Sequence, residues 1–162
     1  MILTIFTLIH VLISFIAIIS GFVVVFAMLR GGLPARWTKI FWTTTALTIL
    51  TGFLFPFHGV TPAFVLGFIA LAVFAVAMFA SRSRWRRTYA VTIVLSLYFN
   101  IFVLIVQSFQ KIPALKDLAP TQTEAPFKLT QLVVLILFTA LGVAAAIRSR
   151  DQAVQTQVKE DI

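Results

Sequence analysis

The stretch Thr51-Gly-Phe-Leu-Phe-Pro-Phe-His-Gly-Val-Thr-Pro62 decides how this chain folds, because it divides one long apolar run into two. The run covers about residues 40–80, roughly twice the ~20 residues that a membrane-spanning helix requires. Pro56, Gly59 and Pro62 lie at its midpoint, and such residues end helices and permit a sharp reversal of the chain. We therefore predict two helices joined here rather than one continuous rod.

The composition indicates a membrane protein. Hydrophobic residues make up 60% of the 162 positions and charged residues only 11%. A soluble domain of this size cannot bury so much apolar surface, so part of the solvent must be lipid. The chain has no cysteine, which excludes disulfides, thiolate metal sites and cysteine nucleophiles. The formal charge of +8 does not indicate nucleic-acid binding, because the basic residues gather at the ends of apolar runs, where topology signals lie.

The apolar runs predict an all-α membrane protein, a single domain over residues 1–162 that forms one bundle of five transmembrane helices. The expected spans are about residues 2–29, 37–57, 61–80, 88–109 and 129–147. An outer loop covers residues 110–128, with one short helical turn at 113–118, and a polar, frayed tail covers 148–162. The first run is too long for a signal peptide and lacks a basic start, so we expect the mature chain to retain it.

The distribution of Lys and Arg predicts the orientation of the bundle. Ten of these 13 residues lie in the turns at 30–39 and 81–87 and in the tail from 148, all on one side of a five-span bundle. The other side carries only Lys111, Lys116 and Lys128. Because short cytoplasmic loops carry the excess of Lys and Arg, we expect a periplasmic N-terminus and a cytoplasmic C-terminus.

Polar side chains from four helices are expected at one level, near the periplasmic boundary. Counting about 20 residues from the basic helix ends, roughly 30 Å of helix, reaches both histidines and the glutamines that flank the outer loop. The loop at 110–128 lies above this level and can act as a lid. The candidate ligand-binding residues are His10, His58, Gln107, Gln110, Gln131 and, deeper in the membrane, Asn100.

Two histidines on separate helices allow several interpretations. His10 and His58 can provide bis-histidine ligation of a b-type haem, or can hydrogen-bond a quinone or another small molecule among phenylalanines. A zinc or copper site is not predicted, because two histidines without cysteine do not readily supply three or four ligands. In the structural interpretation, the histidines and glutamines form a network that pins the helix ends, where polar groups cost less than at mid-membrane.

The remaining patterns favour a protein without catalytic residues. No predicted helix carries Asp, Glu, Lys or Arg near its centre, which weighs against an ion- or proton-coupled transporter. No phosphate-binding loop, nucleophile elbow or metalloprotease motif occurs. We therefore expect a non-enzymatic accessory or assembly protein that contacts membrane lipids, further copies of itself or a larger membrane complex. An oligomeric pore or small transporter stays open as an alternative.

Two stretches resemble a group of small bacterial inner-membrane proteins that carry labels such as hypothetical transmembrane protein. The first is TGFLFPFH at residues 51–58, and the second runs from KIPAL at 111–115 to LAPTQTEAPF at 118–127. The resemblance implies a multi-pass protein of the bacterial inner membrane and places the second motif in the outer loop. It implies no activity, cofactor or catalytic residue.

Overall fold

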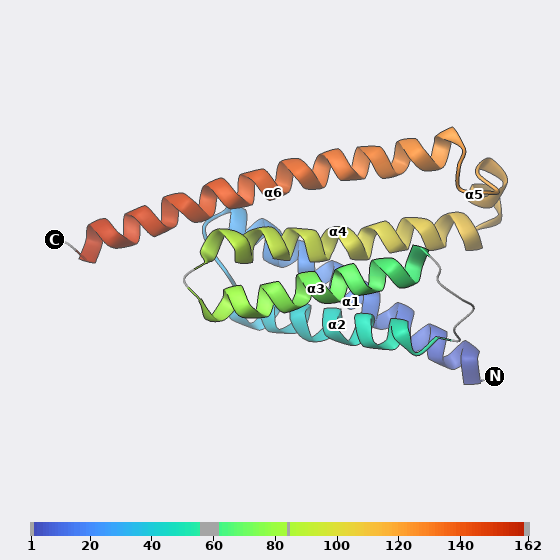
Figure 1. Ribbon diagram of the computed structural model, residues 1–162, viewed down its shortest axis with the longest axis horizontal. Coiled ribbons are helices and arrows are strands. Elements are labelled where there is room, and N and C mark those ends of the chain that lie inside the picture. Colours follow the sequence, from blue (N-terminus) through green and yellow to red (C-terminus); the bar gives the residue numbers. More distant parts are fainter. Residues whose placement is uncertain (1, 56–61, 84, 161–162) are drawn as a thin grey trace.

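The computed structural model describes residues 2–55, 62–83 and 85–160, and the side chains of 3–55, 64–83 and 85–149. These residues form six helices and no strand (Figure 1), so the expected all-α fold is confirmed. The helices are α1 (Ile2–Leu29), α2 (Ala35–Phe53), α3 (Pro62–Arg82), α4 (Arg86–Lys111), α5 (Pro113–Leu118) and α6 (Ala125–Glu160).

The five long helices lie side by side and alternate in direction along the chain (Figure 1). Helix α1 packs along α2 and α4, and α4 also packs along α3 and α6. The connections from α1 to α2 and from α3 to α4 lie at one end of the bundle, which we call the basic end. Residues 110–128, which include α5, lie at the opposite end, and we call them the cap. The basic end carries Arg30, Arg36, Lys39, Arg82, Arg86, Arg87 and Arg148.

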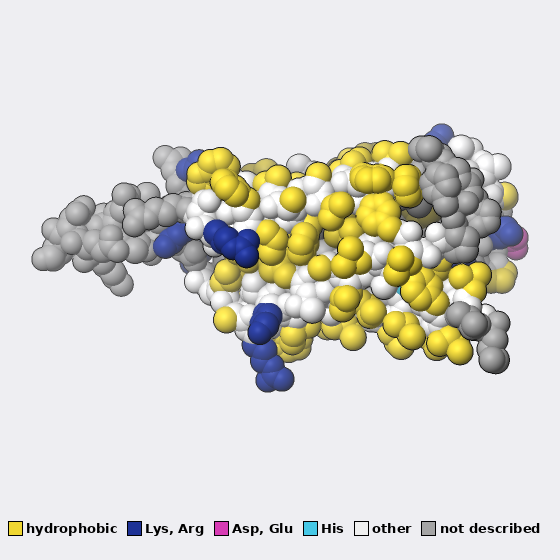
Figure 2. Space-filling view, turned by 60° about the horizontal axis from the view of Figure 1, so that its bottom comes forward, with side chains coloured by type: hydrophobic (Ala, Val, Ile, Leu, Met, Phe, Trp, Pro, Cys, Tyr) yellow, Lys and Arg dark blue, Asp and Glu magenta, His cyan; other side chains and the backbone are white. Residues whose placement is uncertain are grey.

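Four helices are long and apolar enough to cross a membrane, with apolar stretches at Leu3–Leu29, Phe64–Arg82, Arg86–Lys111 and Ala125–Ser149. Hydrophobic side chains cover the middle of the molecule between charged groups at its two ends (Figure 2). Helix α2 has 19 residues, about 28 Å by helical rise. It is not among the four because Arg36, Lys39 and six threonines lower its hydropathy. Length and composition therefore support four spans rather than the predicted five.

Most helix boundaries lie close to the predicted ones. Helix α1 has both predicted ends, and α4 extends two residues further at each end. The predicted turn at 113–118 is confirmed as α5, which begins with Pro113 in its first turn. Helix α2 ends at Phe53 instead of residue 57. Pro56 in the sequence disfavours helical backbone angles at the residue before it, which explains an earlier end.

Helix α6 differs most from the prediction. It begins at Ala125, four residues before the expected start, where the Lys128 N–H donates to the Glu124 carbonyl at 3.2 Å. It continues to Glu160, so the segment expected as a frayed tail is part of this helix. That segment contains two Arg and three Gln and has no Gly or Pro, a composition that permits helix.

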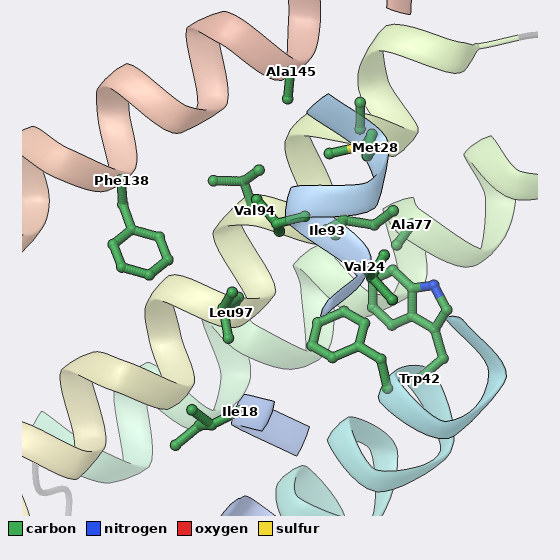
Figure 3. Close-up of a cluster of buried hydrophobic side chains, with 13 residues drawn as sticks. Ile18, Val24, Met28, Trp42, Ala77, Ile93, Val94, Leu97, Phe138 and Ala145 are labelled. Atoms are coloured by element: carbon green, nitrogen blue, oxygen red, sulfur yellow. The ribbon is translucent and has the colours of Figure 1, made fainter. Parts of the chain in front are cut away.

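The buried core lies in the half of the bundle next to the basic end. Figure 3 shows side chains from α1, α2, α3, α4 and α6 meeting there. Trp42 joins three of these helices: its Nε1 donates to the Tyr89 hydroxyl of α4 at 2.9 Å, and its ring packs edge-on against Phe74 of α3. The core residues are Ile18, Val24, Val25, Met28, Phe41, Trp42, Ala77, Ala90, Ile93, Val94, Leu97, Phe138 and Ala145.

The half next to the cap is packed less tightly. Among the described side chains, α1 has no buried residue before Ala17, and α2 has none after Thr45. Every candidate polar residue that the structure describes lies in this half. The fold therefore places them where helix pairs make local contacts rather than in one shared core.

Candidate functional site

His10 lies at the interface of α1 and α2, half-buried, and is hydrogen-bonded to Thr51. The His10 Nδ1 and Thr51 Oγ1 atoms are 2.7 Å apart. The Thr51 hydroxyl donates its proton to the Leu47 carbonyl at 2.6 Å. It is therefore the acceptor toward His10, so Nδ1 carries the proton and Nε2 presents a lone pair.

Phe55 and Gly52 complete the surroundings of the His10 ring. Phe55 packs edge-on against it with the ring centroids 5.2 Å apart, and Phe6 packs against Phe55 at 5.0 Å. A Cβ built on Gly52 would lie 3.9 Å from His10 Cε1, so the ring lies against the α2 backbone at this position. Phe55 and Gly52 thus flank the imidazole, which stays half-buried rather than enclosed.

A second polar contact lies one turn further along the same interface. Ser14 donates from its hydroxyl to the His10 carbonyl at 2.8 Å, and its Oγ lies 3.5 Å from the Thr48 Oγ1 of α2. Polar side chains of α1 and α2 therefore face each other along this interface. They join the two helices in the half of the bundle that lacks a tight core.

His58 lies outside the described residues. The prediction that it meets His10, on which bis-histidine ligation of a haem depends, stays a prediction.

The glutamines lie on a different helix pair. Gln131 of α6 donates from Nε2 to the Phe102 carbonyl of α4 at 3.3 Å, and its Oε1 is buried without a hydrogen-bond partner among the described residues. Gln107 is half-buried on α4, and Gln110 is exposed at its end. Asn100 donates to the Ser96 carbonyl of its own helix at 3.0 Å, a local contact rather than a link between helices. His10 thus contacts α2, whereas Gln131 contacts α4. The residues expected at one level therefore lie at two different interfaces, α1 with α2 and α4 with α6.

The cap is built around the Glu124 carboxylate. One of its oxygens accepts the Thr121 hydroxyl at 2.8 Å and the Thr121 N–H at 3.2 Å, and the other accepts the Thr123 N–H at 3.0 Å. Partial desolvation raises the pKa of the Glu124 carboxyl, but the hydrogen bonds from Thr121 and the backbone amides outweigh it. The pKa therefore lies below its ordinary value of 4.5. The T-x-x-E spacing at 121–124 is that of a capping box, in which the Glu side chain accepts the Thr N–H, although here both residues precede α6, which begins at Ala125.

Two contacts tether the cap to α4. Gln122, which adopts a positive φ of 60°, donates from Nε2 to the Val106 carbonyl at 3.0 Å. Phe109 of α4 and Phe127 of α6 pack edge-on at 5.3 Å. A hollow of about 440 Å³ lies on this cap between Gln110, Lys116 and Gln122. The sequence indicated a loop above the polar level, but it gave no signal that Gln122 would bind α4.

Within the residues that the structure describes, no group of three or more His, Cys, Asp or Glu side chains comes together. No protein-family model, curated protein sequence or solved structure matches this chain. Function must therefore be inferred from the residues themselves.

Proposed function

We propose that this chain is a non-enzymatic accessory or assembly protein of the bacterial inner membrane. It crosses the membrane five times, and its cap contacts a membrane partner on the periplasmic side. Four helices that are long and apolar enough to span provide the foundation for this proposal.

The connectivity supports a fifth crossing by α2. Helix α1 ends at the basic end, whereas α3 begins at the cap end and runs back to the basic end (Figure 1). If α1 and α3 both cross the membrane, the segment between them must return across it. Its Arg36 and Lys39 lie at the basic end of α2, where headgroups and water can solvate them. Its threonines bond within their own helix, as Thr44 does to the Ile40 carbonyl at 2.8 Å.

The charges support the orientation. The basic end collects the larger share of Lys and Arg, and the positive-inside rule assigns such an end to the cytoplasm. The cap and the start of α1 are then periplasmic, and the C-terminal end of α6 is cytoplasmic.

Polar side chains hold the helices of the bundle together across separate interfaces, and the accessory role rests on the exposed apolar side chains of the cap at its end. His10 bonds Thr51 between α1 and α2, and Trp42 bonds Tyr89 between α2 and α4. Gln131 links α6 to α4. Such hydrogen bonds between helices are typical of the contacts that assemble transmembrane bundles.

The cap offers a preformed contact surface. The Glu124 contacts and the Gln122 tether fix its backbone, so little ordering entropy is lost when a partner binds. Leu118 and Ile112 of the cap are 57% and 48% exposed, although both lie outside the apolar helix stretches. Exposed large apolar side chains at such a place favour contact with a partner or with the membrane interface.

A photo-crosslinking amino acid in place of Leu118 tests this role in intact cells. We expect a discrete crosslinked product to a membrane protein. A matched substitution at Leu137, which is exposed in the middle of the apolar stretch of α6, should give no discrete product. A purified protein that is stable and colourless and forms no larger assembly, together with no Leu118 product in cells, would contradict the proposal.

A second candidate is a periplasmic-side binder of haem b, a quinone or another small molecule at His10 and His58. The lone pair on His10 Nε2 favours it, because that nitrogen is the one a ligand would use once Nδ1 bonds Thr51. A purified, fully loaded preparation without a Soret band excludes haem. For a quinone, mass spectrometry of organic extracts should find a stoichiometric molecule that His10→Ala or His58→Ala loses.

A further inference from the structure

A groove lies between α3 and α4, with a volume of about 480 Å³. It is lined by Ala72 and Val76 of α3 and by Thr88, Val91 and Leu95 of α4, with Arg87 beside Thr88. Thr88, Val91 and Leu95 are spaced three and four residues apart, so they share one face of α4. Because most of these side chains are short, the two helices leave a channel along their outer surface.

The α4 side of the groove is apolar apart from Thr88 at its beginning and Thr92, whose hydroxyl donates to the Tyr89 carbonyl at 2.8 Å. From Thr88 to Leu95 it extends about 10 Å along the helix. Val76 and Leu95 are 46% and 38% exposed, so the groove opens to the surroundings of the bundle rather than to its core. In a membrane this surface faces lipid chains.

Arg87 supplies the charge at the basic end of this groove. Its neighbour Trp85 is 57% exposed and packs edge-on against Phe79 of α3 at 5.6 Å. Tryptophan side chains collect at the headgroup level of membranes, so Arg87 lies close to lipid phosphates. The two carboxylates whose side chains the structure describes, Asp117 and Glu124, lie in the cap at the opposite end. Neither neutralises Arg87.

We propose that this groove binds an anionic phospholipid, with one acyl chain along α3 and α4 and the headgroup phosphate at Arg87. A guanidinium can donate two parallel hydrogen bonds to a phosphate, and Thr88, the next residue in the chain, also lines the groove. Basic side chains at the cytoplasmic ends of transmembrane helices attract anionic headgroups, and the apolar channel retains the chain below. The inference rests on the membrane placement proposed above, and on neither the accessory role nor the cap.

Native mass spectrometry of the full chain in detergent tests the groove, with dioleoylphosphatidylglycerol as the probe and dioleoylphosphatidylcholine as the zwitterionic control. We expect a preference for phosphatidylglycerol that falls about fivefold in Arg87→Gln. Arg86→Gln removes an exposed charge that does not line the groove, so it should retain the preference. Val76→Phe should also weaken binding, because it fills the channel without changing charge. Thermal unfolding in lipid-free detergent checks that each variant folds.

Three outcomes would contradict phospholipid binding in the groove. They are equal binding of both lipids, an equal loss of the phosphatidylglycerol preference in Arg86→Gln and Arg87→Gln, or an Arg87-dependent stabilisation by inorganic phosphate alone. The first leaves no headgroup selection, the second shows diffuse charge attraction, and the third assigns the site to free phosphate. A protein that stays dispersed without detergent would instead contradict the membrane placement. Absence of a Leu118 crosslink bears only on the accessory role.

Discussion

Gly21 of α1 and Phe41 of α2 lie so close that no side chain fits between them. A Cβ at position 21 would be 2.8 Å from Phe41 Cε2 and 2.7 Å from Leu97 Cδ1. Phe41 and Leu97 are both 0% exposed, so neither can move aside without displacing other core side chains. The missing side chain at Gly21 therefore permits the close approach of α1 to α2 and α4.

Gly21→Ala is expected to lower the free energy of unfolding by about 1–3 kcal/mol, because the added methyl overpacks a closed core. Thermal unfolding in detergent measures this as a lower midpoint. Gly142→Ala is the matched control, since its Cβ would meet only Val94 Cγ1 at 3.8 Å. That change removes a glycine from a helix interior and should be neutral or stabilising by up to about 1 kcal/mol. Equal midpoints for Gly21→Ala and the parent protein would show that the core can relax around position 21.

Thr51→Val tests the link between α1 and α2. It keeps the shape of the side chain but leaves the His10 Nδ1–H without its acceptor, which costs about 1–3 kcal/mol at a half-buried position. Thr51→Ser retains the hydroxyl and should stay close to the parent protein. The midpoint of thermal unfolding distinguishes the two variants. If valine and serine behave alike, the hydrogen bond contributes nothing and the aromatic contacts of Phe55 hold His10 instead.

The sequence predicted the helices well because their ends are set by local features. Apolar runs, Pro and Gly breakers and basic turns act within a few residues of each boundary, and both ends of α1 and the short helix α5 agree with them. The continuation of α6 was not predicted, because the polar residues from 148 onward were interpreted as a frayed tail. Charge alone does not end a helix in a segment without Gly or Pro.

The candidate site was predicted less well. The depth of a residue in the membrane can be counted from the sequence, but the direction in which its helix face points cannot. Counting helical rise places His10 and Gln131 at one level, and both lie in the half of the bundle next to the cap. It says nothing about which helices pack together. Because α6 packs along α4 while α1 packs along α2, the two side chains bond different neighbours. Their partners, Thr51 and the Phe102 carbonyl, depend on tertiary packing that no residue spacing encodes.

The cap should open in acid. The pKa of the Glu124 carboxyl is lowered in the folded protein. The stabilisation of the cap by the ionised carboxylate is therefore fully present above the ordinary pKa of 4.5 and is lost as the pH falls through the lower pKa of the folded state. Protonation removes the charge that the Thr121 and Thr123 amides hydrogen-bond. Hydrogen exchange followed by mass spectrometry should show protection of residues 121–123 decreasing below about pH 4.5, after correction for intrinsic rates. Glu124→Gln should show weaker protection that does not change with pH. Protection in the parent protein that is constant down to pH 2 would assign the cap's order to Gln122 and the Phe109–Phe127 contact.

Gln131→Met separates a structural glutamine from a ligand-binding one. The Oε1 of Gln131 is buried with no hydrogen-bond partner in the part of the chain that the structure describes, and its Nε2 contact to Phe102 is long at 3.3 Å. A methionine of similar length removes the unpaired acceptor. We therefore expect the free energy of unfolding of the purified protein to be unchanged or raised by about 1 kcal/mol. Gln131→Glu should lower the midpoint strongly, because it places a carboxylate beside the Phe102 carbonyl. If methionine instead destabilises the protein as purified, the Oε1 has a partner that the described residues do not supply. In that case the interface of α4 and α6, rather than the His10 contact, becomes the place to look for a bound molecule.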